Sequence, residues 1–118
     1  MKPATFHAAA AFLASAFSFG WPVDAAGQAP ELPTFHVVAK DGRLLPNRLE
    51  VPVGKKIKLT LANEGRSPVE FENLELRIEK VLAPGGVSFV VLHPLKPGSY
   101  RFIDEFHADT AEMLLIAK

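Results

Sequence analysis

Glu70 and Glu72 alternate with Phe71 in a short segment that has the composition of a β-strand. Successive side chains of a strand point to opposite faces, so the two carboxylates project from one face and Phe71 from the other. Paired carboxylates on one face could bind a single ion, and oxygen ligands suit Cu(II), Fe(III) or Mn(II) rather than Cu(I). The structural alternative is that both glutamates lie on the solvated face of an edge strand.

A second set of metal-binding residue types lies near the C-terminus, within residues 100–113 (YRFIDEFHADTAEM). Asp104 and His107 stand three residues apart, and Met113 follows six residues later. Each of them also has a structural alternative. Asp104 could accept N–H bonds from the backbone of a turn, and His107 could be a surface residue of a tight loop. Met113 begins an apolar segment, where methionine usually fills space in a core.

Composition excludes several classes of function. Cysteine is absent from the 118 residues, so no disulfide, thiolate metal site or thiol nucleophile is available. The 13 Lys and Arg residues balance the 13 Asp and Glu residues, which leaves no excess charge to drive binding to nucleic acid. Nucleophile–base motifs, phosphate loops and the zinc motif H-E-x-x-H are also missing. The sequence therefore gives no support to hydrolytic or nucleotide chemistry and predicts no catalytic residue.

The N-terminus has the layout of a secretory signal peptide, predicted to cover residues 1–25. A single lysine precedes an apolar stretch, residues 8–21, that is too short and too alanine-rich to span a bilayer. Small residues follow, with cleavage expected after Ala25, and a retained membrane anchor is the alternative. We expect an exported, periplasmic protein without direct membrane insertion, with a linker over residues 26–33 and one domain over residues 34–118.

The domain is expected to be an all-β sandwich. Short β-branched and aromatic segments follow one another with Gly, Pro, Asn or Asp between them. The clearest strand is residues 55–62 (KKIKLTLA), where alternation places Ile57, Leu59 and Leu61 on one buried face. About seven to eight such strands, with no helical period of any length, predict two packed sheets.

From Phe35 onward the sequence resembles a cupredoxin. Five segments carry the resemblance: residues 49–54 (LEVPVG), 61–63 (LAN), the loop at Pro68, 94–100 (PLKPGSY) and 100–113. Within that superfamily the sequence is similar to the EfeO-type cupredoxin-like domains and, more closely, to the small periplasmic cupredoxin-like proteins that accompany Ftr-type high-affinity iron permeases. Residues 68–72 (PVEFE), 79–85 (EKVLAPG) and 105–111 (EFHADTA) carry this narrower resemblance. It implies a cupredoxin-like Greek-key β-sandwich.

The resemblance also implies a place for a metal. In a cupredoxin, copper is held by a His after the Asn-containing loop and by the Cys, His and Met of the C-terminal loop. Carried onto this chain, these positions fall near Glu70 and at Asp104, His107 and, one residue late, Met113. A blue-copper site needs the thiolate and cannot form here. What the resemblance implies instead is a copper or iron ion held by His107, Glu70, Glu72, Asp104 and Met113.

Three hypotheses for function follow. The first is a periplasmic metal-binding accessory of high-affinity iron uptake, of redox or ferroxidase type, with a membrane iron permease and a periplasmic iron-binding protein as its partners. The second is a copper carrier that delivers metal without turnover. The third is a degenerate cupredoxin sandwich that binds a protein partner and no metal.

Overall fold

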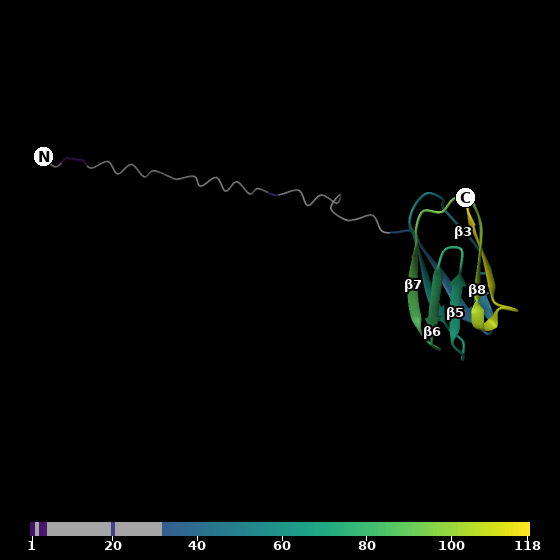
Figure 1. Cartoon of the computed structure of the whole chain (residues 1–118). Coiled ribbons are helices and arrows are strands. Elements are labelled where there is room, and N and C mark those ends of the chain that lie inside the picture. The colour runs from purple at the N-terminus through teal and green to yellow at the C-terminus, as the bar shows by residue number, and fades with distance from the viewer. Residues whose placement is uncertain (2, 5–19, 21–31) are drawn as a thin grey trace.

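The computed structural model of the chain describes residues 1, 3, 4, 20 and 32–118. The predicted signal peptide (1–25) and linker (26–33) fall almost entirely outside these residues. Within the described residues, no helix is long and apolar enough to cross a membrane. The strands follow from Thr34 to the C-terminal end of the chain (Figure 1).

Strands dominate the described part of the domain. In chain order they are β1 (Thr34–Lys40), β2 (Arg43–Leu45), β3 (Arg48–Val51), β4 (Ile57–Asn63), β5 (Val69–Asn73), β6 (Ile78–Leu82), β7 (Val87–Leu92), β8 (Gly98–Asp104) and β9 (Glu112–Ala117). One turn of 3-10 helix, η2 (Glu105–His107), follows β8. The all-β prediction is confirmed. The structure has nine strands rather than seven to eight because β2, with three residues, is too short to show an alternating pattern in the sequence.

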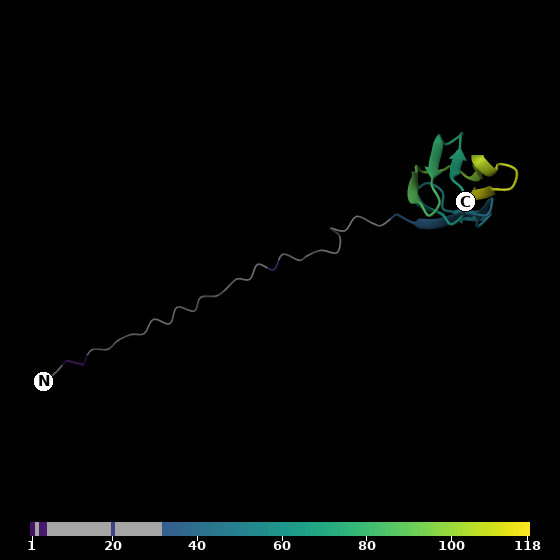
Figure 2. The ribbon, with the colours of Figure 1, turned by 90° about the horizontal axis from the view of Figure 1, so that it is seen from below.

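The strands form two sheets. One has the order β2-β1-β4-β7, and the other has the order β3-β9-β8-β5-β6. The pairs β1–β4 and β3–β9 are parallel and join strands that are distant in the sequence, as expected of a Greek-key sandwich. Figure 2 shows β1 and β5 on opposite sides of the domain. The two sheets therefore enclose the core between them.

Alternation along the strands builds that core. In β4 the side chains of Ile57, Leu59 and Leu61 are buried, as the sequence pattern predicted. In the second sheet, Phe71 of β5 stacks on Phe102 of β8, with ring centroids 4.8 Å apart and an interplanar angle of 15°. Offset stacking of buried aromatic rings contributes beyond the burial of their area. This pair packs on the inner face of β5 and β8.

A hydrogen bond connects the turn between β1 and β2 to the loop before β9. Gly42 has a φ of 70°, a left-handed conformation that glycine adopts without steric cost. Its carbonyl oxygen accepts a hydrogen bond from Thr110 Oγ1 at 2.5 Å. A Cβ atom at position 42 would lie 3.0 Å from Oγ1 of Thr110, so a side chain there would crowd the hydrogen bond. The glycine therefore lets the β1–β2 turn approach the C-terminal loop.

Candidate functional site

The register of β5 against β8 separates the predicted ligands into two groups. Phe71 pairs with Asp104, and Glu72 pairs with Ile103. Side chains directly opposite each other in a sheet share a face, so Asp104 lies on the inner face with Phe71. Glu70 and Glu72 alternate with Phe71 and therefore lie on the outer face. The structure does not bring the five predicted ligands to one point.

On the outer face, three carboxylates come together. Glu70, Glu72 and Glu79 each offer an oxygen within 4.8 Å of the others. Glu79 belongs to β6 and pairs directly with Glu72 across the β5–β6 ladder. In the part of the chain that the structure describes, this is the single group of three or more His, Cys, Asp or Glu side chains that meets this criterion. We call these three residues the carboxylate cluster.

The β5–β6 hairpin positions the cluster. Asn73, which is 5% exposed, donates from Nδ2 to the carbonyl oxygen of Arg101 and accepts at Oδ1 from the amide of Leu76. Arg77 takes a φ of 56° and donates from its amide to the carbonyl oxygen of Leu74. These contacts close the turn in the register that places Glu79 opposite Glu72.

Glu72 is the buried member of the cluster, with 6% of its surface exposed. Burial, followed by the carboxylates of Glu105, Glu70 and Glu79, raises the pKa of Glu72 above its ordinary value. None of the ion pairs among the described residues includes Glu72. The nearby guanidinium of Arg101 pairs instead with Glu112, with Nε and Oε2 3.0 Å apart. A cation would therefore relieve a repulsion that no described side chain neutralises.

The cluster is open to solvent on one side. Glu72 and Glu105 border a surface hollow of about 210 Å³, which Arg101 and Ile103 also line. An ion can reach the buried carboxylate from this side. Hard cations such as Mn(II), Fe(III) and Ca(II) prefer carboxylate oxygens, and the cluster supplies oxygen atoms only.

Asp104 has the structural role that was its alternative to metal binding, because it accepts hydrogen bonds from backbone amides. It is 1% exposed, and its Oδ1 accepts hydrogen bonds from the amides of Glu70 at 2.9 Å and Phe106 at 3.1 Å. Its Oδ2 lies 2.5 Å from Nδ1 of His107. The carboxylate therefore caps η2 and ties β5 to the C-terminal loop through both of its oxygens.

His107 also has both ring nitrogens engaged. Nδ1 bonds to Asp104, and Nε2 lies 3.2 Å from Oγ of Ser67. The ring is partly exposed, with 29% of the side-chain surface accessible. Ser67 could not be recognised as a functional residue from the sequence, because 40 residues separate it from His107 and no short motif joins them.

Met113 belongs to the core. Its side chain is 0% exposed, and its partner in the β8–β9 ladder is Phe102. It fills space in the hydrophobic cluster, which is the structural alternative for this residue.

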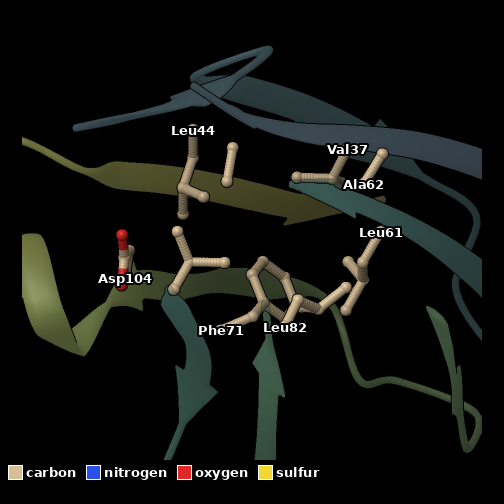
Figure 3. A pocket seen from close by; sticks show the side chains of 9 residues that line it. Val37, Leu44, Leu61, Ala62, Phe71, Leu82 and Asp104 are labelled. Carbon is tan, nitrogen blue, oxygen red and sulfur yellow. The ribbon is translucent and has the colours of Figure 1, made fainter. Parts of the chain in front are cut away.

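The inner face has no place for a thiolate-dependent copper ion. Figure 3 shows Asp104 at the edge of an interior that is otherwise lined by apolar side chains, among them Leu44, Phe71 and Leu82. The cavity there measures about 10 Å³, at the lower limit for one water molecule. The residues present therefore do not fit a blue-copper centre, since the thiolate is missing and Asp104 is already fully hydrogen-bonded.

Several solved structures share this fold at low sequence identity. The metal-binding domain of the Cu(I)-exporting P-type ATPase of Streptococcus pneumoniae D39 matches with a TM-score of 0.67 and 13% identity, over 77% of this chain and 90% of that one. Auracyanin from the photosynthetic bacterium Roseiflexus castenholzii matches with a TM-score of 0.58 and 15% identity, over 72% of this chain and 96% of that one. At these identities the likeness concerns the fold alone.

A sequence relative and a family model complete the comparison. An uncharacterized protein of Rickettsia prowazekii (strain Madrid E) is 39% identical over 80 residues, which is 68% of this chain. The chain spans 64% of that protein's length. The model of the cupredoxin-like domain family matches residues 6–117. This chain, a β-sandwich without cysteine, belongs to the cupredoxin-like domain family.

Proposed function

We propose that this protein binds a metal ion through Glu70, Glu72 and Glu79 and serves as a periplasmic accessory of high-affinity iron uptake. The observation that carries the metal site is the convergence of the three carboxylates within 4.8 Å around the buried Glu72. The sequence resemblance to cupredoxin-like proteins that accompany iron permeases supports the role in iron uptake. A membrane iron permease and a periplasmic iron-binding protein would then be its partners.

For the proposed role in iron uptake, Cu(II) and iron are the candidate ions. The similarly folded metal-binding domain of the Cu(I)-exporting ATPase binds Cu(I), and copper is therefore tested together with iron. Three carboxylates without sulfur or imidazole disfavour Cu(I) and stabilise the oxidised state of a redox metal. A site that prefers Fe(III) over Fe(II) suits a ferroxidase-type accessory. Oxygen consumption after addition of Fe(II) would separate this role from that of a carrier without turnover.

Calorimetric titration of the metal-free protein tests the site. With Cu(II), or with Fe(II) under anaerobic conditions, the parent is expected to bind one ion per chain. Glu72→Gln removes the charge at the centre of the cluster and is expected to weaken binding at least tenfold. Glu75→Gln is the matched control, because Glu75 is exposed in the same hairpin and outside the cluster.

A histidine variant distinguishes the carboxylate cluster from the ligand set that the resemblance implied. Since His107 is on the other side of the β5–β8 pair, His107→Ala is expected to bind the ion as the parent does. Equal binding by the parent and Glu72→Gln would disprove the cluster as the site. Loss of binding in His107→Ala alone would move the site to the C-terminal loop.

An exposed apolar strand favours a second candidate, a metal-free interaction module. Val87, Phe89 and Val91 of the edge strand β7 are 75%, 52% and 40% exposed. Contiguous exposed apolar residues mark surfaces that bind other proteins. If no ion binds the parent at near-neutral pH, this candidate replaces the first.

A further inference from the structure

Ser67, His107 and Asp104 form a continuous hydrogen-bonded series at one end of the sandwich. Oγ of Ser67 lies 3.2 Å from Nε2 of His107, and Nδ1 of the same ring lies 2.5 Å from Oδ2 of Asp104. The order is hydroxyl, imidazole and buried carboxylate. The same order of groups activates a serine nucleophile on several unrelated folds, and it is defined by geometry rather than by sequence position.

The contacts of Asp104 select the tautomer of His107 that such a series needs. Oδ1 of Asp104 already accepts two backbone N–H groups, from Glu70 and Phe106. Oδ2 is left as the acceptor for Nδ1–H of His107. Nε2 of a neutral ring then carries no proton and accepts the hydroxyl proton of Ser67. Asp104 is thus a positioning residue that leaves His107 as a base toward Ser67.

Asn63 holds Ser67 in place. The Asn63 side chain is buried, with 1% of the residue exposed. Its Nδ2 donates to the carbonyl oxygens of Ser67 at 2.8 Å and Leu82 at 3.1 Å, and its Oδ1 accepts from the amide of Gly65 at 3.0 Å. The loop that carries the hydroxyl is therefore anchored from inside the sandwich, while the Ser67 side chain faces solvent.

An open hollow of about 440 Å³ adjoins the series and has room for a small molecule. Ser67 and His107 both line it, together with Lys40, Arg66 and Asp41. Because two of these side chains are cationic and one is anionic, the hollow favours a ligand with a negative charge.

We propose that Ser67 is the nucleophile of an acyl-transfer site that hydrolyses small carboxylic esters with an anionic acyl group. Oγ of Ser67 attacks the carbonyl carbon while its proton moves to Nε2 of His107. The bond to the alcohol oxygen then breaks, and the leaving alkoxide takes the proton from Nε2. Water repeats the sequence on the acyl-serine, which releases the carboxylic acid and restores Ser67. This activity is independent of the metal site proposed above.

Labelling of the full chain with an alkyl fluorophosphonate tests the nucleophile. The reagent is expected to add one phosphonyl group with loss of fluoride, and peptide mass analysis is expected to place it on Ser67. Ser99, which is exposed on β8, serves as the internal control in the same sample. His107→Gln is expected to slow labelling of Ser67 about a hundredfold, the loss that removal of a general base produces. The succinate monoester of p-nitrophenol then probes hydrolysis, which Ser67→Ala should abolish.

Each outcome bears on the proposal directly. Labelling of Ser67 no faster than that of Ser99 in the parent would overturn it without the need for any variant. Equal rates for the parent and a folded His107→Gln variant would also overturn it, because Ser67 would then be an ordinary hydroxyl. Labelling of Ser67 needs no metal ion, and the calorimetric metal titration needs no reaction at Ser67. Failure of the metal site and failure of the nucleophile are therefore distinguishable.

Discussion

Glu72 of β5 lies directly opposite Glu79 of β6, so two carboxylates face each other across one antiparallel pair. Like charges in directly opposed positions destabilise a sheet. The opposed carboxylates therefore destabilise the metal-free protein. A cation bound between them would turn this repulsion into a net attraction.

Glu79→Gln tests this relationship. The substitution removes one charge from the opposed pair and is expected to raise the free energy of unfolding of the metal-free protein by about 0.5 kcal/mol. Urea denaturation in the presence of a chelator measures it. Glu75→Gln, outside the cluster, is expected to have no effect. A lower stability of Glu79→Gln would contradict the repulsion that the register implies.

The raised pKa of Glu72 predicts a pH dependence of stability. The folded-state pKa lies above the ordinary value of 4.5, because burial and the carboxylates of Glu105, Glu70 and Glu79 disfavour the charged form. Between the two values the folded protein holds more protons than the unfolded chain, so the free energy of unfolding falls as the pH rises through this range. The contribution is complete below pH 4.5 and is lost above the folded-state pKa.

The contribution of Glu72 can be isolated by comparison with Glu72→Gln. The difference in free energy of unfolding between parent and variant is expected to shift in favour of the variant as the pH rises above 4.5. Urea denaturation of the metal-free proteins at a series of pH values measures this difference. A difference that is constant with pH would show that Glu72 titrates alike in the folded and unfolded states.

The faces of individual strands could be predicted from the sequence, but their pairing could not. Alternation placed Ile57, Leu59 and Leu61 in the core and Glu70 and Glu72 on one face, and the structure confirms both. Alternation within a strand does not reveal which residue of another strand lies opposite. This is why the sequence did not indicate that Asp104 shares the face of Phe71, or that Glu79 joins Glu72.

The resemblance predicted that two loops lie close together, but it did not predict the contacts between them. It brought the Pro68 loop and the C-terminal loop to one end of the sandwich, and Ser67 and His107 do meet there. In a cupredoxin a metal ion joins these loops. Here Asp104, buried and bonded to the amide of Glu70 and the ring of His107, makes the connection through hydrogen bonds.

Asp104→Ala is expected to lower the free energy of unfolding by about 3 kcal/mol. The substitution leaves the amides of Glu70 and Phe106 without their acceptor and removes the partner of His107. Thermal and urea denaturation check the value. Asp109→Ala is the control, because Asp109 is exposed in the same loop and should change stability by less than about 0.5 kcal/mol. Equal stability of the two variants would mean that Asp104 does not connect the loops.

Asn63→Ala is expected to affect both stability and the chemistry of Ser67. Loss of three hydrogen bonds from a buried side chain should lower the free energy of unfolding by about 2 kcal/mol. The loop then loses its anchor, so Ser67 departs from His107 and its labelling by a fluorophosphonate should slow while the domain stays folded. Glu64→Ala, an exposed change in the same loop, should leave both quantities unchanged. If Asn63→Ala lowers stability but Ser67 still reacts at the parent rate, the position of Ser67 depends on contacts other than those of Asn63.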